Sequence, residues 1–257
     1  MSAQKAWVVA VANQKGGVAK TTTVGSLGSA FAEQGLSVLL VDLDPQACLT
    51  FSLGIDPEGL QSSIHQVLLG ETKASEVVLE TDDGVDLLPA TIELATAEQL
   101  LLMRTGREQL LKAALAPLLK SYDVIMLDCP PSLGVLTTVA LTAANAVLIP
   151  LQCETLSHRG VGQLLDTIHD VKRMTNRRLK VVGVLPTLFD SRTTHGRLVL
   201  ERIGEDYGVA VLDPPIPKSV RFAEAPAAGR SILATARTSK GAEAYRAVAG
   251  SLLSARA

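Results

Sequence analysis

An α/β fold, with a doubly wound, mostly parallel sheet and helices on both faces, is predicted by two patterns in the sequence. Strand-like runs of Val, Ile and Leu alternate with helix-like segments along the 257 residues. Most of these runs are continuously apolar, as expected for strands that helices cover on both faces. Alternating β and α segments join parallel strands through right-handed crossovers. With 47% hydrophobic residues the chain can bury one substantial core, and we expect a single domain over residues 1–257.

Each expected element follows from its local composition, in chain order. Short apolar runs predict the strands Trp7–Ala12, Ser37–Asp42, Val85–Pro89, Asp123–Asp128, Ala146–Leu151, Lys180–Leu185 and Val209–Leu212. Apolar residues at helical spacing predict the helices Thr22–Gln34, Ser62–Leu69, Ala95–Leu119, Ser132–Ala144, His158–Thr175, Arg192–Tyr207 and Lys240–Ser254. Because ligands of such sheets bind at the carboxyl ends of the strands, we expect the functional site at that edge.

A phosphate-binding loop is predicted directly after the first expected strand, where residues 13–23 read NQKGGVAKTTT. In such a loop the backbone N–H groups and the dipole of the following helix bind an anion. Lys20 would reach the terminal phosphates of a nucleotide, and the Thr21 hydroxyl would ligate Mg²⁺. The expected phosphate cradle consists of Gly16, Gly17, Val18, Ala19, Lys20, Thr21 and Thr22.

The loop departs from the usual G-x-x-x-x-G-K-[ST] pattern in two ways. Gln14 and Ala19 occupy the two outer glycine positions, and an additional lysine, Lys15, stands at the head of the loop. We expect a negative φ at Ala19, because a methyl group is tolerated there only in that conformation. The additional lysine is the hallmark of the deviant Walker A branch of P-loop ATPases, which this loop resembles.

Three further segments extend the resemblance along the chain. Residues 41–46 read VDLDPQ, residues 124–132 read VIMLDCPPS, and residues 216–221 read IPKSVR with EAP at 224–226. In this order the four motifs resemble the ParA/Soj chromosome- and plasmid-partitioning ATPases, relatives of MinD, from about residue 6 to about residue 248. The resemblance implies a P-loop fold that binds ATP and Mg²⁺ and hydrolyses ATP slowly until a partner stimulates it.

The same resemblance implies roles for individual residues. Asp44 would orient or activate the attacking water, and Asp128 would hold Mg²⁺ through water. Asp42 would support either the magnesium shell or the loop. Lys15 would cross a dimer interface to the nucleotide of the partner subunit, and Pro217 lies in the segment that contacts the base in relatives. The expected catalytic residues are Lys15, Lys20 and Asp44.

Charge is distributed unevenly along the chain, whose net charge is −2. Residues 1–150 carry 8 Lys and Arg against 16 Asp and Glu (net −8), whereas residues 151–257 carry 16 against 10 (net +6). The asymmetry indicates an electropositive face, and non-specific contact with DNA phosphates is the expected mode because aromatic residues are scarce, at 3%. Arg192 and Arg221 match positions where relatives carry DNA-contacting arginines, and we expect Lys218 and Arg230 to join them.

The partners that the resemblance implies are a second copy of the chain in an ATP-bound homodimer, non-specific double-stranded DNA and a ParB-like centromere-binding protein. We expect a cytoplasmic, nucleoid-associated protein that does not bind membranes, because the apolar run near the N-terminus is too short to span a bilayer. Cys48, Cys129 and Cys153 lack the spacing of a metal site and indicate reduced thiols. Only a dozen residues precede the loop, so we expect no N-terminal helix-turn-helix domain.

Three alternatives share the predicted fold. A MinD-like membrane-associated ATPase would need an amphipathic C-terminal helix with a basic flank, and residues 243–257 offer little basic charge. A ligase related to dethiobiotin or cobyrinate synthesis would use ATP to activate a carboxylate, and Lys15 and the motif around Arg221 argue against it. The third is a ParA-like ATPase that positions a protein cargo, and the sequence barely distinguishes it from a partitioning ATPase.

Overall fold

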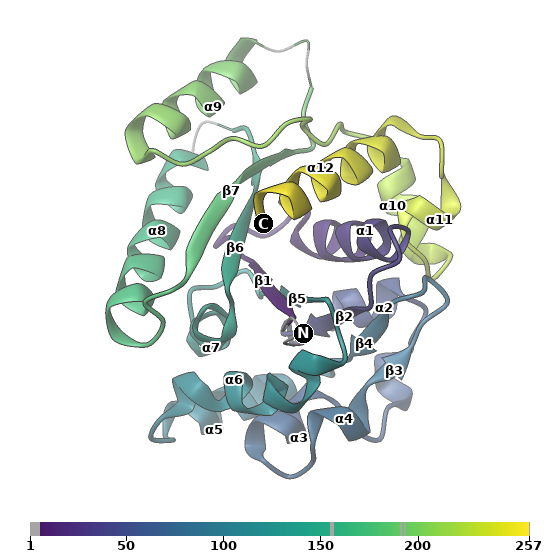
Figure 1. Ribbon diagram of the computed structural model, residues 1–257, viewed down its shortest axis with the longest axis vertical. Helices are drawn as coiled ribbons and strands as arrows, with labels where there is room; N and C mark the ends of the chain where they lie inside the picture. Colours follow the sequence, from purple (N-terminus) through teal and green to yellow (C-terminus); the bar gives the residue numbers. More distant parts are fainter. Residues whose placement is uncertain (1–5, 155–156, 191, 193, 257) are drawn as a thin grey trace, which may run out of the picture.

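The computed structural model describes residues 6–154, 157–190, 192 and 194–256. Its centre is a seven-stranded sheet in the order β3-β4-β2-β5-β1-β6-β7 (Figure 1). Strands β3 and β4 pair antiparallel, and the other neighbouring strands pair parallel, so the predicted mostly parallel sheet is confirmed. The strands are β1 (Trp7–Val11), β2 (Val38–Asp42), β3 (Leu79–Glu80), β4 (Asp86–Leu88), β5 (Val124–Asp128), β6 (Ala146–Gln152) and β7 (Lys180–Thr187).

Helices connect the strands and follow the last of them. The α-helices are α1 (Lys20–Ala32), α2 (Cys48–Ser52), α3 (Ile64–Leu69), α4 (Ala74–Val77), α5 (Leu94–Leu102), α6 (Leu110–Leu115), α7 (Val135–Ala143), α8 (Ser157–Met174), α9 (Thr194–Tyr207), α10 (Arg221–Ala227), α11 (Ile232–Thr235) and α12 (Lys240–Arg256). Short 3₁₀ helices are η1 (Pro57–Gly59), η2 (Arg107–Gln109) and η3 (Ala116–Lys120).

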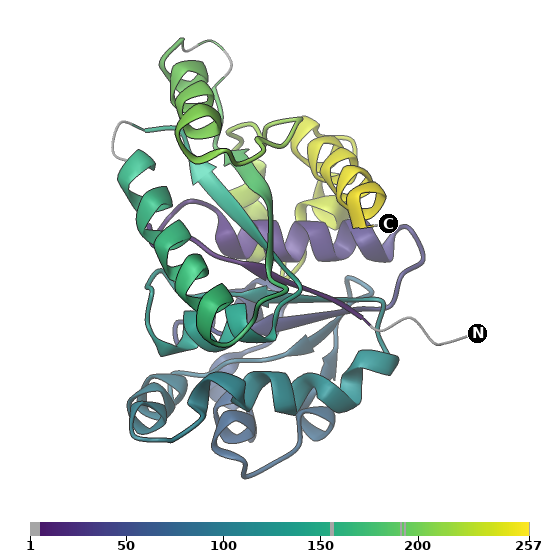
Figure 2. The ribbon, with the colours of Figure 1, turned by 60° about the vertical axis from the view of Figure 1, so that its left-hand side comes forward.

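The sheet is covered on both faces, which creates two apolar cores. Helices α1, α10, α11 and α12 lie on one face, and α3 to α7 lie on the other (Figures 1 and 2). Phe31 of α1 and Tyr245 of α12 are fully buried in the first core. Leu94 of α5 and Leu136 of α7 are fully buried in the second. This two-sided burial explains why the strands are continuously apolar in sequence.

The prediction of a strand at Val209–Leu212 is wrong. The segment forms only an isolated bridge between Val184 and Val211, with hydrogen bonds from Val184 N–H to Ala210 O and from Leu212 N–H to Val184 O, both 2.8 Å. Pro214 and Pro215 follow, and proline has no N–H with which to continue a ladder. An apolar run therefore lies beside β7 without becoming a strand.

The expected long helix Ala95–Leu119 is also wrong, because it is divided into α5, η2, α6 and η3. The chain turns between α5 and η2, where Gly106 has a φ of 71°. This left-handed conformation is accessible to glycine and interrupts a helix. The sequence periodicity continues across the turn because α5 and α6 bury their apolar faces in the same core.

The remaining expected elements match observed ones within a few residues, although residue 193 of the expected helix Arg192–Tyr207 lies outside the described residues. The short elements β3, α2, α4, α10 and α11 were not predicted, because two to seven residues are too few to show a periodicity. Among the described residues, no helix combines the length and apolarity needed to cross a bilayer.

Candidate nucleotide site

Three of the predicted motifs meet at the carboxyl edge of three neighbouring strands. Strand β5 lies between β1 and β2, and Asp128 at its end is in register with Val11 of β1 and Asp42 of β2. The phosphate loop follows β1, and Asp44 lies two residues beyond β2. The sheet register therefore brings together residues that are separated by more than a hundred positions in the sequence.

The loop is held in place by polar contacts to two other strands. Asn13 donates from its Nδ2 to Pro150 O of β6 at 2.7 Å, and its Oδ1 accepts the Lys15 N–H at 3.0 Å. Val18 O accepts the Thr187 hydroxyl of β7 at 3.0 Å. Asn13 and Thr187 were not among the predicted site residues. Asn13 adjoins the motif, whereas no sequence signal links Thr187 to a loop 169 residues away.

The expectation of a negative φ at Ala19 is wrong. Ala19 is the N-cap of α1 with φ 63° and ψ 36°, in the left-handed region. For an L-residue with a Cβ, this conformation costs about 1–2 kcal/mol. The fully buried Val18 and the mostly buried Lys20 on either side fix the path of the chain, so the surrounding structure imposes the left-handed turn.

Replacing Ala19 by glycine is therefore expected to stabilise the protein. Glycine removes the left-handed penalty but adds about 0.4–1 kcal/mol of conformational entropy to the unfolded chain. The net increase in the free energy of unfolding should be about 0.5–1 kcal/mol, measured by urea denaturation without nucleotide. A less stable Ala19→Gly variant would show that the turn carries no strain.

Lys20 is buried at the start of α1, with 7% of its surface exposed. Its ammonium donates to Lys15 O at 3.0 Å. Burial lowers the pKa of Lys20, and the negative charges of Asp128 and Asp44 partly oppose that shift. A buried ammonium beside the loop can bind an anion that replaces its lost hydration.

Asp128 fits the role of a metal carboxylate. It is fully buried, and neither of its side-chain oxygens has a hydrogen-bond partner within the described part of the chain. Burial and the Asp42 carboxylate raise the pKa of Asp128 well above its ordinary value, and Thr21 and Lys20 lower it. Two orphaned oxygens near a hydroxyl suit Mg²⁺, so Asp128 and Thr21 are the residues that would hold it.

The side chain of Asp42 stabilises the loop that carries Asp44, and its oxygens are occupied by protein hydrogen bonds. Its Oδ2 accepts the Thr50 N–H at 2.9 Å and the Thr50 hydroxyl at 2.8 Å, and its Oδ1 accepts the Asp44 N–H at 3.1 Å. Burial raises the pKa of Asp42, and these hydrogen bonds oppose the shift. Both oxygens have protein partners, so of its two expected roles the structure favours support of the loop that carries Asp44.

Asp44 and Lys15 face different surroundings. Asp44 is half-buried, lines the cavity beside the phosphate loop, and accepts the Gln46 N–H at 2.9 Å. Lys15 does not line this cavity, and its ammonium forms an ion pair with Glu154 just beyond β6. The side chain of Lys15 remains 41% exposed. Of the two lysines of the loop, Lys20 is therefore buried beside the cavity and Lys15 lies at the surface.

The cavity beside the loop has a volume of about 740 Å³. The loop and α1 form one side. Helix α2 with the residue after it contributes the apolar Phe51 and Leu53, and α10 contributes Phe222 and Pro226. Pro217, expected near the base, does not line the cavity, whereas Leu188 and Ser219, close in sequence to the two residues of the Phe189–Pro217 bridge, do. The volume and the mixed lining fit a nucleotide.

Of the four predicted DNA contacts, three lie outside the cavity and are exposed, and one lines the cavity. Arg192 is 87% exposed and binds Asp190 through two side-chain bonds of 2.9 and 2.7 Å, which lower the pKa of Asp190 to about 2. Lys218 is exposed beside the Phe189–Pro217 bridge, and Arg221 is 61% exposed at the start of α10. Arg230, in contrast, lines the cavity and forms an ion pair with Asp83.

Comparison with known proteins accounts for this arrangement. The family model described as an AAA domain matches residues 6–181. The sporulation initiation inhibitor protein Soj of Bacillus subtilis is 42% identical over 93% of this chain and 94% of its own length. The chromosome partitioning protein ParA of Caulobacter vibrioides is 39% identical over 99% and 96%, respectively. The chain belongs to the ParA/Soj family. The predicted resemblance is thereby confirmed.

Solved structures agree on the fold of this ParA-family chain. A Mycobacterium smegmatis structure named cobyrinic acid a,c-diamide synthase, with a bound ATP analogue and magnesium, is 58% identical over 96% of this chain and 94% of its own, with a TM-score of 0.87. Cyanothece McdA has the same TM-score at 23% identity, which shows the shared fold alone. The expected ATP and Mg²⁺ are consistent with the ligands of the M. smegmatis structure.

Proposed function

We propose that this ParA-family chain is an ATP-driven switch for DNA partitioning. ATP with Mg²⁺ closes a homodimer that binds double-stranded DNA without sequence preference, and hydrolysis releases it. A ParB-like partner stimulates the slow hydrolysis, and the cycle positions a chromosome or plasmid. The observation that supports this most is the orphaned Asp128 carboxylate beside Thr21, with Lys20 and Asp44 at the same cavity.

Phosphoryl transfer to water requires neutralised phosphates, a metal and a positioned water. Lys20 and the backbone of the loop would neutralise the phosphates, and Asp128 and Thr21 would hold Mg²⁺, which would add positive charge where negative charge develops. Asp44 would accept a hydrogen bond from the attacking water. The exposure of Lys15 supports its role in trans: once released from Glu154, it can reach the nucleotide of a partner subunit.

DNA binding would use Arg192, Lys218 and Arg221, which lie beyond the carboxyl end of β7. Arg230 is left out of this set because it lines the nucleotide cavity and its carboxylate partner, Asp83, is buried. One protomer offers few phosphate contacts, and a dimer doubles them. Because affinity falls steeply with each lost contact, dimerisation driven by ATP would control DNA binding. The protein would then be associated with the nucleoid.

The experiment that tests the proposal is binding to random-sequence duplex DNA with ATP, with ADP and without nucleotide, across a salt series. Binding that occurs only with ATP and weakens as salt rises is the expected result. Equal binding in all three nucleotide states would contradict the switch. Failure to bind DNA in any state, with ATP binding intact, would contradict partitioning altogether.

Arg221→Glu is expected to abolish retention on DNA. Reversing the charge removes one phosphate contact per protomer, so any residual binding should show a salt slope that is smaller by about two for the dimer. Electrophoretic mobility shifts with ATP at several salt concentrations measure this. Glu224→Ala, which removes the ion-pair partner of Arg221 without reversing a positive charge, is the matched control and should retain binding. Wild-type DNA affinity in Arg221→Glu would remove Arg221 from the interface.

A second candidate function comes from the name of the M. smegmatis structure, cobyrinic acid a,c-diamide synthase. In that case the ATP site would activate a carboxylate of cobyrinic acid instead of a water. ATP turnover with DNA or with cobyrinic acid separates the two functions. Amide formation also needs a nitrogen donor, so ammonia or glutamine is supplied with the cobyrinic acid. Turnover that depends on cobyrinic acid and yields an amide would replace the partitioning proposal, whereas indifference to cobyrinic acid in the presence of the nitrogen donor would exclude the synthase.

A further inference from the structure

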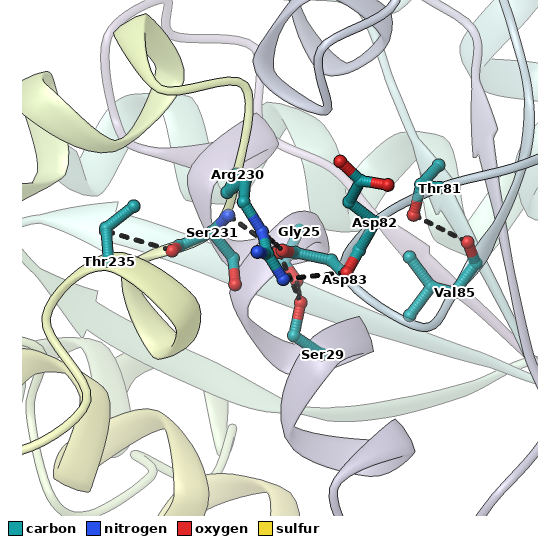
Figure 3. Close-up of polar contacts among 9 residues, drawn as sticks. All are labelled: Gly25, Ser29, Thr81, Asp82, Asp83, Val85, Arg230, Ser231 and Thr235. Carbon is teal, nitrogen blue, oxygen red and sulfur yellow. Dashed lines mark hydrogen bonds and ion pairs between the residues drawn. The ribbon is translucent and has the colours of Figure 1, made fainter.

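A buried carboxylate that binds two residues of the cavity lining joins three segments of the chain. The side chain of Asp83, in the turn between β3 and β4, is only 1% exposed. Its Oδ1 accepts from Arg230 Nε at 2.9 Å, and its Oδ2 accepts the Ser231 N–H at 2.6 Å and the Ser29 hydroxyl at 3.2 Å. Asp82 O accepts from Arg230 Nη2 at 2.7 Å (Figure 3). We call Asp83 with these partners the Asp83 clamp.

The clamp fixes the turn between α10 and α11, and this turn belongs to the cavity. Arg230 and Ser231 line the cavity, and so do Phe222 and Pro226 of α10 immediately before them. The guanidinium is bound at two of its nitrogens, which fixes its plane as well as its position. Asp83 therefore acts on the nucleotide site without lining it.

We call the side of the cavity that Phe222 and Pro226 of α10 line the α10 wall. Few apolar contacts hold this wall in place independently of the clamp. Within α10, Ala225 is the only buried residue, and Phe222 is half-buried against Tyr245, with ring centroids 5.9 Å apart. A segment with little buried apolar surface opens at a low free-energy cost unless polar contacts retain it. The buried carboxylate is such a contact, because its charge loses stabilisation when the turn moves away.

The same turn packs against the chain just after α2, which also contributes residues to the cavity. A Cβ added to Gly229 would lie 2.7 Å from Gly54 Cα. The two backbones are therefore too close together for any side chain at Gly229. Gly54 lies two residues after the end of α2, the helix that begins four residues beyond Asp44. The α2 and α10 sides of the cavity are thus joined at this contact.

We propose that Asp83 is a positioning residue for nucleotide binding. By holding the α10–α11 turn against α1, it keeps the α10 wall where a bound nucleotide is enclosed. The inference rests on the proposed ATP site and deepens it. It assigns Arg230 to the nucleotide cavity and not to the DNA contacts expected from the sequence.

Asp83→Ala tests the assignment. Without the clamp only a fraction of molecules holds the wall in place, and the apparent affinity falls by that fraction. We expect the Kd for ATP–Mg²⁺, measured by isothermal titration calorimetry, to rise about tenfold. In turnover assays KM should rise by the same factor with little change in kcat, because Lys20, Asp44 and Asp128 are untouched. Arg230→Ala should raise the Kd by a similar factor. The double variant should bind ATP no more weakly than either single variant, because both changes break the same contact.

Glu33→Ala is the matched control. Glu33 binds Arg246 through two bonds of 2.6 and 2.9 Å, which link the end of α1 to α12, and neither residue lines the cavity. Its loss removes an ion pair and should leave the Kd for ATP unchanged. Asp83→Asn, which keeps an acceptor oxygen in place, should restore part of the affinity. If Asp83→Ala does not fold, Asp83→Asn and Arg230→Ala carry the test, and both should weaken ATP binding.

An unchanged Kd and KM in folded Asp83→Ala would overturn the inference and leave Asp83 a role in stability alone. The inference would also be overturned if Glu33→Ala weakened ATP binding as much as Asp83→Ala, since any lost ion pair would then suffice. Failure of the wild-type chain to bind ATP–Mg²⁺ is a different result, which overturns the proposed function itself.

Discussion

Lys20→Ala is expected to lower the affinity for ATP by about a hundredfold or more. The Lys20 ammonium is buried at the head of α1, near the negatively charged Asp128 and Asp44. Removing it leaves the phosphates near these carboxylates with Mg²⁺ but without the ammonium that would neutralise part of their charge. Truncating one member of a buried charge pair costs about 2–5 kcal/mol, and about 2.8 kcal/mol corresponds to a hundredfold change in Kd. Calorimetric titration with ATP–Mg²⁺ measures the loss.

The other lysine of the loop provides the control. Lys15→Ala removes an exposed ammonium that does not line the cavity, so ATP should still bind one protomer. What Lys15→Ala should lose is the ATP-dependent dimer, visible in analytical ultracentrifugation. Equal loss of ATP affinity in both variants would contradict the division of the two lysines between cis and trans roles.

Asp44→Ala is expected to separate ATP binding from hydrolysis. Removing a positioned proton acceptor typically slows a reaction by about a hundredfold or more. Asp44 lies at the cavity, and its backbone N–H is held by Asp42, so a shorter side chain should leave the loop in place. The variant should bind ATP, dimerise and remain on DNA, because the release step depends on hydrolysis. Phosphate release and DNA retention after an ATP chase are the two readouts.

Hydrolysis by Asp44→Ala at the parental rate would refute the assignment of Asp44. Loss of ATP binding in the same variant would have another meaning, since Asp44 would then be needed to shape the cavity. The nucleotide Kd of the variant, measured alongside its rate, separates these outcomes.

Much of the candidate site could be predicted because it is encoded in contiguous motifs. The loop from Asn13 to Thr23 could be identified from the order of its glycine, lysine and threonine residues after an apolar strand. Asp128 could be identified because a carboxylate ends an apolar strand. Parallel strands place their carboxyl ends at one edge, so convergence of the motifs followed from the fold class.

Other features could not be read from local sequence, and each has a physical reason. The helix between residues 95 and 119 is broken at Gly106, a turn that periodicity across a shared core conceals. Val209–Leu212 has the composition of a strand but is followed by Pro214 and Pro215. Ala19 adopts a positive φ that its side chain disfavours, because its buried neighbours fix the path of the loop.

The sequence by itself determined the fold class and the family, and it located the loop after β1 and the carboxylate at the end of β5, because these depend on periodicity and on short motifs of defined chemistry. Only the tertiary structure decided what Lys15, Asp42 and Arg230 contact. Arg230 could be read only as a basic residue until the fold brought it to Asp83, 147 positions away in the chain. An exposed charge is available to DNA, whereas a charge bound by a buried carboxylate is held in place, and burial is a property that no single segment carries.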